Sequence, residues 1–214
     1  MTNLRVPFTV ALTVAALGLA ACGGDDGDET TAQGAAKEDA QSASPDLDRF
    51  LMRNGEEPGF RQGAAPGAMP AERVSISGVE AFAAEMQLTP ADTQRLARTG
   101  FVSWTVQPIR GPRSAGLSGV NLYETAQGAK QDLAHELRPS VIRSNGPIAG
   151  LRFFRVPGIP GARGWTASEP PVGNVLWVEG RCMLVLGNQG PGPFVGPLSE
   201  GARAIYERTN GECP

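Results

Sequence analysis

The sequence predicts an α+β fold in which helices pack on a mostly antiparallel sheet, and three observations indicate it. Residues 101–109 alternate between apolar and polar side chains, as a strand with one buried face does. Residues 175–178 and 181–186 are rich in β-formers and flank a turn at Glu179-Gly180, which predicts a hairpin. Apolar residues at helical spacing recur at 125–137 and 197–209. Antiparallel strands with interspersed helices imply an α+β domain.

The domain is expected to begin with a short helix. Apolar residues at helical spacing between 47 and 51 follow Ser44-Pro45, an N-cap and a first-turn proline, and Asn54-Gly55 would end the helix. A brief strand is predicted at 73–77. Two capping-box patterns, Ser77 with Glu80 and Thr89 with Asp92, then predict two consecutive helices.

The segment 101–109 would bury Val102, Trp104 and Val106 on one face, while Pro108 argues against a long central strand. A second strand is predicted at 117–123 and a helix at 125–137. The apolar face of that helix is expected to consist of Ala126, Ala129, Leu133 and Leu137, which places His135 on the solvent side.

The second half of the domain repeats this order. A strand at 151–156 and a loop at 157–164 precede the hairpin, and the helix at 197–209 ends at Asn210-Gly211. Residues 101–137 and 174–209 therefore each have the order strand, strand, helix, with Trp104 and Trp177 at similar places. We expect two ββα-like units, and chance similarity between them remains open.

Two cysteines lie in the domain, and they are predicted to form one disulfide. An exported chain meets an oxidising compartment, where Cys182 and Cys213 allow a single pairing. This bond would connect the hairpin to the end of the last helix. A redox or metal pair is the alternative, although no histidine is nearby.

The N-terminus has the pattern of an export signal. Arg5 precedes an apolar run at 6–18 that is too short to span a membrane of about 30 Å. Residues 1–21 are therefore expected to be a signal peptide. Residues 22–44 contain six acids, one lysine and no large apolar residue after Cys22, which predicts a flexible acidic tether. The remaining residues, 45–214, have the length of one domain.

The tetrapeptide Leu19-Ala20-Ala21-Cys22 resembles the lipobox of bacterial lipoproteins. In that family the cysteine is alkylated with diacylglycerol, the peptide is cut before it, and the new N-terminus is often acylated, for example with palmitate. The resemblance implies that Cys22 is the lipidation site. It also implies a protein held on the extracytoplasmic side of the cell membrane.

Composition and residue types favour binding over catalysis. Basic and acidic residues nearly balance in 45–214, so the domain lacks the excess of positive charge that is typical of nucleic-acid-binding proteins. Nucleophilic catalysis normally needs a positioned base, and His135 is the only histidine. We expect no enzyme activity, no cofactor and no metal site. A carboxylate-pair hydrolase acting on cell-wall polymer remains a minor alternative, with Glu56, Glu57 and Glu169 as loop acids.

A binding surface for an anionic ligand is predicted in the stretch LRFFRVPGIPGARGW at 151–165, and we call it the ligand lip. Its arginines and tryptophan could form a cationic, aromatic-lined recess; these residues are Arg152, Arg155, Arg163 and Trp165. Structural turns and edge arginines are the plainer interpretation.

In the order of its elements, the domain resembles the PsbP-like and receptor-kinase sensor-like modules of secreted actinobacterial lipoproteins. That resemblance implies a membrane-anchored binding module for an apolar or anionic ligand of the cell envelope, which could be a small molecule or a lipid. An accessory protein that docks an envelope or membrane protein is the alternative.

Overall fold

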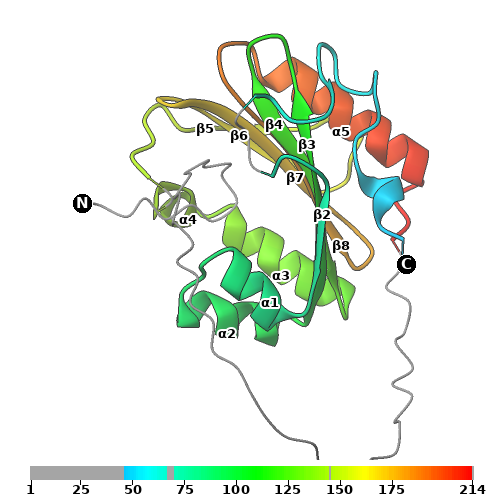
Figure 1. Cartoon of the computed structure of the whole chain (residues 1–214), viewed down its shortest axis with the longest axis vertical. Coiled ribbons are helices and arrows are strands. Elements are labelled where there is room, and N and C mark those ends of the chain that lie inside the picture. The colour runs from blue at the N-terminus through cyan, green and yellow to red at the C-terminus, as the bar shows by residue number, and fades with distance from the viewer. Residues whose placement is uncertain (1–45, 67–69, 145, 214) are drawn as a thin grey trace, which may run out of the picture. The chain divides into compact units, whose positions relative to one another are not determined.

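The computed structural model describes residues 46–66, 70–144 and 146–213. Its strands form one antiparallel sheet of eight strands in the order β1-β3-β4-β8-β7-β6-β5, with β2 also paired to β3 (Figure 1). The strands are β1 (Arg61–Gln62), β2 (Val74–Ser77), β3 (Phe101–Arg110), β4 (Ala115–Tyr123), β5 (Arg152–Arg155), β6 (Arg163–Ser168), β7 (Pro171–Glu179) and β8 (Cys182–Gln189).

Helices cover both faces of this sheet, so the predicted α+β class is confirmed (Figure 1). One face packs against η1 (Asp48–Phe50) and α5 (Val195–Thr209), whose buried side chains meet Trp177 and Leu184. The other face packs against α1 (Val79–Glu85), α2 (Pro90–Arg98), α3 (Ala126–Glu136) and α4 (Pro139–Ser144).

The two predicted ββα units are present as β3-β4-α3 and β7-β8-α5. Their helices lie on opposite faces of the sheet, because α3 joins the core with Trp104 and α5 joins the core with Trp177. Both tryptophans are buried. In each unit the tryptophan of the leading strand therefore faces the helix of its own unit.

The expectation that Pro108 would exclude a long central strand is wrong. β3 is a ten-residue strand that pairs with β4 along its length and with β1 and β2 on its other side. The carbonyl of Pro108 accepts a 3.0 Å hydrogen bond from the Gly63 N–H, on the β1 side. Since the N–H and C=O of one strand residue point the same way, the donor that proline lacks falls in the gap between β1 and β2.

The predicted face of β3 also needs correction. A bulge between Phe101 and Ser103 places Phe101, Trp104 and Val106 in the core beneath α1 and α3, whereas Val102 packs against the core on the α5 side. Both faces of β3 are covered. The inserted residue shifts the alternation by one, which a strict period of two does not predict.

Of the two predicted capping boxes, the one at the start of α2 is confirmed and the one at the start of α1 is not. The Thr89 hydroxyl accepts from the N–H of Asp92 at 3.2 Å and begins α2. The N-cap of α1 is Gly78, with φ of +84° and no side-chain cap, and not Ser77. At the other end of the domain, Asn210 ends α5 in the left-handed conformation, as predicted.

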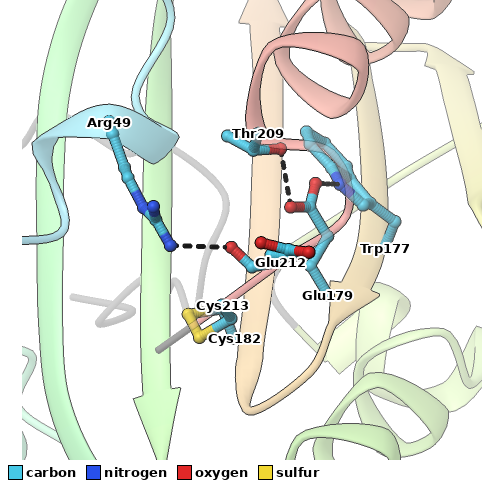
Figure 2. Close-up of a disulfide and its surroundings, with 7 residues drawn as sticks. All are labelled: Arg49, Trp177, Glu179, Cys182, Thr209, Glu212 and Cys213. Atoms are coloured by element: carbon cyan, nitrogen blue, oxygen red, sulfur yellow. Dashed lines mark hydrogen bonds between the residues drawn. A yellow bond between two sulfur atoms is a disulfide. The ribbon is translucent and has the colours of Figure 1, made fainter.

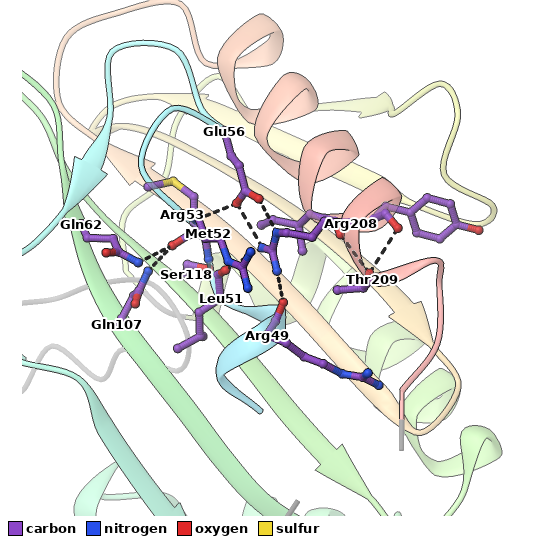
Figure 3. Close-up of polar contacts among 12 residues, drawn as sticks. Arg49, Leu51, Met52, Arg53, Glu56, Gln62, Gln107, Ser118, Arg208 and Thr209 are labelled. Carbon is purple, nitrogen blue, oxygen red and sulfur yellow. Dashed lines mark hydrogen bonds and ion pairs between the residues drawn. The ribbon is translucent and has the colours of Figure 1, made fainter. Parts of the chain in front are cut away.

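The N-terminal segment, residues 46–62, contains the three-residue helix η1 in place of the predicted longer helix, and it ends in β1. Side chains distant in sequence satisfy its backbone (Figure 3). Arg208 donates to the carbonyls of Arg49 and Leu51 and pairs with Glu56. The Met52 N–H donates to the Ser118 hydroxyl at 2.9 Å. These contacts fix an irregular path across the sheet, which local helical spacing does not predict.

The predicted disulfide between Cys182 and Cys213 is confirmed, with the two Cα atoms 5.7 Å apart (Figure 2). It joins the start of β8 to the residues after α5. Arg49 donates to the carbonyl of Glu212, next to Cys213, at 2.9 Å. The disulfide, the end of α5 and the N-terminal segment are therefore linked at one end of the sheet.

Candidate functional site

An open depression of about 410 Å³ lies between α2 and the C-terminal half of α3. Its lining is strongly cationic and consists of Arg95, Arg98, Thr99, Gln131, His135 and Arg138. We call it the arginine depression. Its volume is in the range of small-molecule sites.

Helix packing brings these residues together from two separate segments. Arg95 and Arg98 lie in the last turn of α2, and Gln131 and His135 lie one turn apart on α3. Gly128 allows the close approach, because a Cβ there would lie 1.9 Å from the carbonyl oxygen of Thr99. A side chain at 128 would clash with the backbone of Thr99 unless the two segments moved apart.

Beneath the depression lies a buried polar network that fixes Arg95. Its guanidinium pairs with Asp132 and, at 3.3 Å, with Glu136, both on α3. Tyr123 donates its hydroxyl hydrogen to Asp132, and the Asn121 amide donates to Tyr123 at 3.2 Å. Asp132 and Tyr123 are fully buried. The network therefore holds α2, α3 and β4 in register under the depression.

Burial sets the titration of this network. It raises the pKa of Glu136, the neighbouring Asp132 carboxylate adds to the increase, and Arg95 opposes it. The pKa of Tyr123 is raised well above its usual value by burial and then by Asp132. Tyr123 is therefore a neutral hydrogen-bond donor, and the Asp132 carboxylate pairs with the Arg95 guanidinium.

The mouth of the depression keeps its positive charge. Arg98 and Arg138 are exposed, and in the part of the chain that the structure describes neither forms an ion pair with an acidic side chain. His135 is half-buried beside them. Burial lowers its pKa, and Arg95 and Arg138 lower it further. Such an arrangement can hold an anion through guanidinium groups and a neutral imidazole.

The structure does not gather the residues of the predicted ligand lip into one recess. Arg155 and Arg163 are directly opposite each other on β5 and β6, on the same face as Trp165. Arg152 points to the other face of the sheet, and Trp165 is only 4% exposed in the core beneath α4. A ligand role for Arg152, Arg155, Arg163 and Trp165 stays a prediction.

Sequence reasoning missed the arginine depression because it assigned the wrong inner face to α3. The predicted face was apolar, but the residues that α3 buries are Gly128, Ala129, Asp132 and Glu136. Two carboxylates, Asp132 and Glu136, therefore lie on the buried face of α3. The i, i+4 spacing of Asp132 and Glu136 was visible in the sequence, but their partner Arg95 is 37 and 41 residues away from them.

A further buried acid, Glu57, lies on the opposite face of the sheet beneath α5. It is fully buried, and the Asn188 amide on β8 donates to its carboxylate. Burial raises the pKa of Glu57 to about 7, and the hydrogen bond from Asn188 opposes the increase. The Glu57 carboxyl therefore changes from protonated to ionised near neutral pH.

Two further features of the described residues concern metal binding and membrane crossing. No three His, Cys, Asp or Glu side chains there gather as a metal ion would require. In the same residues, no helix combines the length and apolar character needed to cross a membrane. Cys22 and the segments 1–21 and 22–44 lie outside the described residues.

The geometry defines an α+β domain with a cationic depression between two helices. No protein-family model matches the sequence, and no curated protein matches it significantly. Among solved structures it is similar to the extracellular domain of PknH from Mycobacterium tuberculosis, with 13% identity and a TM-score of 0.47. The match covers 77% of this chain and 95% of that one. The likeness is weak, and it carries no argument about a ligand or partner.

Proposed function

We propose that this protein is a lipid-anchored binding module on the extracytoplasmic side of the cell membrane, and that it binds an anionic ligand in the arginine depression. The lipobox residues Leu19 to Cys22 support the location. The arginine depression supports the ligand class. Binding is proposed without turnover, so the ligand is recovered unchanged from the complex.

The observation that carries the proposal is that the buried arginine of the depression is held by acidic partners, whereas the exposed arginines at its opening are not. Asp132 and Glu136 hold the Arg95 side chain in place, so it need not reorganise when an anion binds. Arg98 and Arg138 add charge that no described acid neutralises. Convergent cations of this kind are unfavourable without an anion, because like charges repel.

The first test is a titration of the purified full-length chain with phosphate, sulfate and succinate at constant ionic strength. Arg98→Gln and Arg138→Gln remove charge from the mouth and leave the buried network intact. Each is expected to weaken binding by about ten- to a hundredfold, since a charged hydrogen bond contributes about 1.5–3 kcal/mol. Isothermal titration calorimetry measures the change.

The control is Arg152→Gln with Arg155→Gln on the edge strand β5, which removes two positive charges elsewhere, one more than either test variant. Unchanged affinity in this double variant, with weaker binding in the Arg98 and Arg138 variants, supports the arginine depression. Weaker binding in the double variant, with unchanged affinity in the Arg98 and Arg138 variants, would instead indicate that the anion binds at the ligand lip predicted from the sequence. Absence of saturable binding by all three anions would overturn the proposed function.

The anchor is tested separately with Cys22→Ser. This change removes the sulfur that the acyl chains require, so the protein should move from the membrane fraction to the soluble fraction and lose fatty-acid label. Fractionation with and without detergent measures the shift. Membrane retention with unchanged labelling would contradict the lipid anchor without bearing on the arginine depression.

A further inference from the structure

His135 lines the arginine depression between charged groups of both signs. It lies on α3, with Arg138 three residues later and Arg95 across from it on α2. Charged groups face it from both elements: Arg95 and Asp92 from α2, and Asp132 and Arg138 from α3 and its end. The two arginines favour the neutral imidazole, and the two aspartates favour the cation.

An anion in the arginine depression changes that balance. A group of charge −2 within a few ångströms offsets the repulsion from Arg95 and Arg138 and favours the imidazolium. A protonated imidazole also donates from both ring nitrogens, whereas the neutral form donates from one. Oxygen atoms of the anion accept such bonds, so protonation adds a contact that the free protein does not need.

We propose that the arginine depression binds a tetrahedral oxyanion of charge −2, of the phosphate or sulfate class, and that His135 takes up a proton as the oxyanion binds. This inference rests on the proposed function and specifies the ligand class and the pH response of the same site. The guanidinium groups of Arg98 and Arg138 hold the oxygens at the mouth, and His135 contacts the anion from the wall.

The proton balance fixes the direction of the pH effect. In the free protein His135 is neutral at pH 7, because burial and the arginines lower its pKa. If the complex contains the imidazolium, each bound anion takes one proton from solution. Affinity then increases as pH falls, by up to about tenfold per pH unit between the two pKa values of His135.

Sulfate is the decisive probe, since it does not titrate between pH 5 and pH 8 and any proton taken up belongs to the protein. Calorimetric titrations of the full-length chain at pH 6.5, in two buffers of different ionisation enthalpy, measure the number of protons. We expect a substantial fraction of one proton per sulfate. His135→Gln is expected to bind sulfate with no proton uptake and with an affinity that no longer depends on pH.

Glu136→Gln identifies the proton acceptor. The Glu136 carboxyl is the other group near Arg95 whose proton occupancy could change, because burial raises its pKa. Uptake that persists in Glu136→Gln and vanishes in His135→Gln supports the proposal. Uptake that vanishes only in Glu136→Gln overturns it. Sulfate binding without proton uptake overturns it as well and leaves the proposed function standing.

A phosphate group can belong to a soluble molecule or to a lipid, and two further probes separate these sources. Glycerol phosphate represents the soluble class, and vesicles of phosphatidic acid in phosphatidylcholine represent the headgroup class. The Cys22→Ser chain is used with vesicles, so that its own acyl chains do not hold it there. Binding of either probe that weakens in Arg98→Gln supports the proposal, and binding of neither overturns it.

Discussion

Replacing Glu57 with glutamine is expected to increase the free energy of unfolding at pH 8 by about 3 kcal/mol. The carboxylate of Glu57 is fully buried beneath α5, and burial raises its pKa from 4.5 to about 7. Above pH 7 the folded protein must bury a negative charge, whereas glutamine is neutral at every pH. The amide oxygen of glutamine can still accept from the Asn188 amide.

The sign follows from proton occupancy in the two states. Between pH 4.5 and pH 7 the folded state keeps the Glu57 proton that the unfolded state has lost. The contribution of Glu57 to stability is therefore complete below pH 4.5 and declines as pH rises to 7. In Glu57→Gln this decline is absent, so the two proteins should be equally stable at pH 4 and diverge as pH rises.

Urea denaturation at pH 4, 6 and 8, followed by tryptophan fluorescence, measures this difference. Trp104, Trp165 and Trp177 are all buried and report the loss of the core. The exposed Glu207 on α5 provides the control, since Glu207→Gln removes the same charge without changing burial. Parallel pH profiles for wild type and Glu57→Gln would contradict the prediction.

The hairpin of β7 and β8 shows why the sheet was predictable in outline but not in extent. Its β-branched residues and the turn at Glu179-Gly180 predict two short strands. In the structure the first strand begins earlier, at Pro171, and the second continues to Gln189. The added residues include Gly173, Asn174, Gly187 and Asn188, which have low strand propensity. Their pairing with β4 and β6 keeps them extended, because sheet context overrides intrinsic preference.

The arginine depression could be predicted only in parts. The Thr89 cap fixes where α2 begins, and counting from it places Arg95 and Arg98 in its last turn. The sequence does not show that α2 lies against α3, because this depends on the close contact of Gly128 with Thr99. Hydrophobic periodicity then assigned α3 a purely apolar inner face, since a buried Asp132 is favourable only once Arg95 and Tyr123 are present.

Reducing the bond between Cys182 and Cys213 is expected to lower the free energy of unfolding by about 3–4 kcal/mol. The two cysteines are 31 residues apart, and the bond limits the conformations of that loop in the unfolded chain. Cys213→Ser should reproduce the loss. Cys182 is fully buried, so its free thiol stays in the apolar core as a small hydrophobic group.

The same change is expected to loosen the N-terminal segment, 46–62. Figure 2 shows Arg49 of η1 donating to the carbonyl of Glu212, which the disulfide holds in position. Hydrogen exchange should therefore accelerate at 48–51 in Cys213→Ser more than at the centre of β4, which pairs with strands on both sides. Cys22→Ser as the background excludes exchange with a third thiol. Equal urea midpoints for the oxidised and reduced protein would show that the Arg208 contacts and the core alone hold this end of the fold.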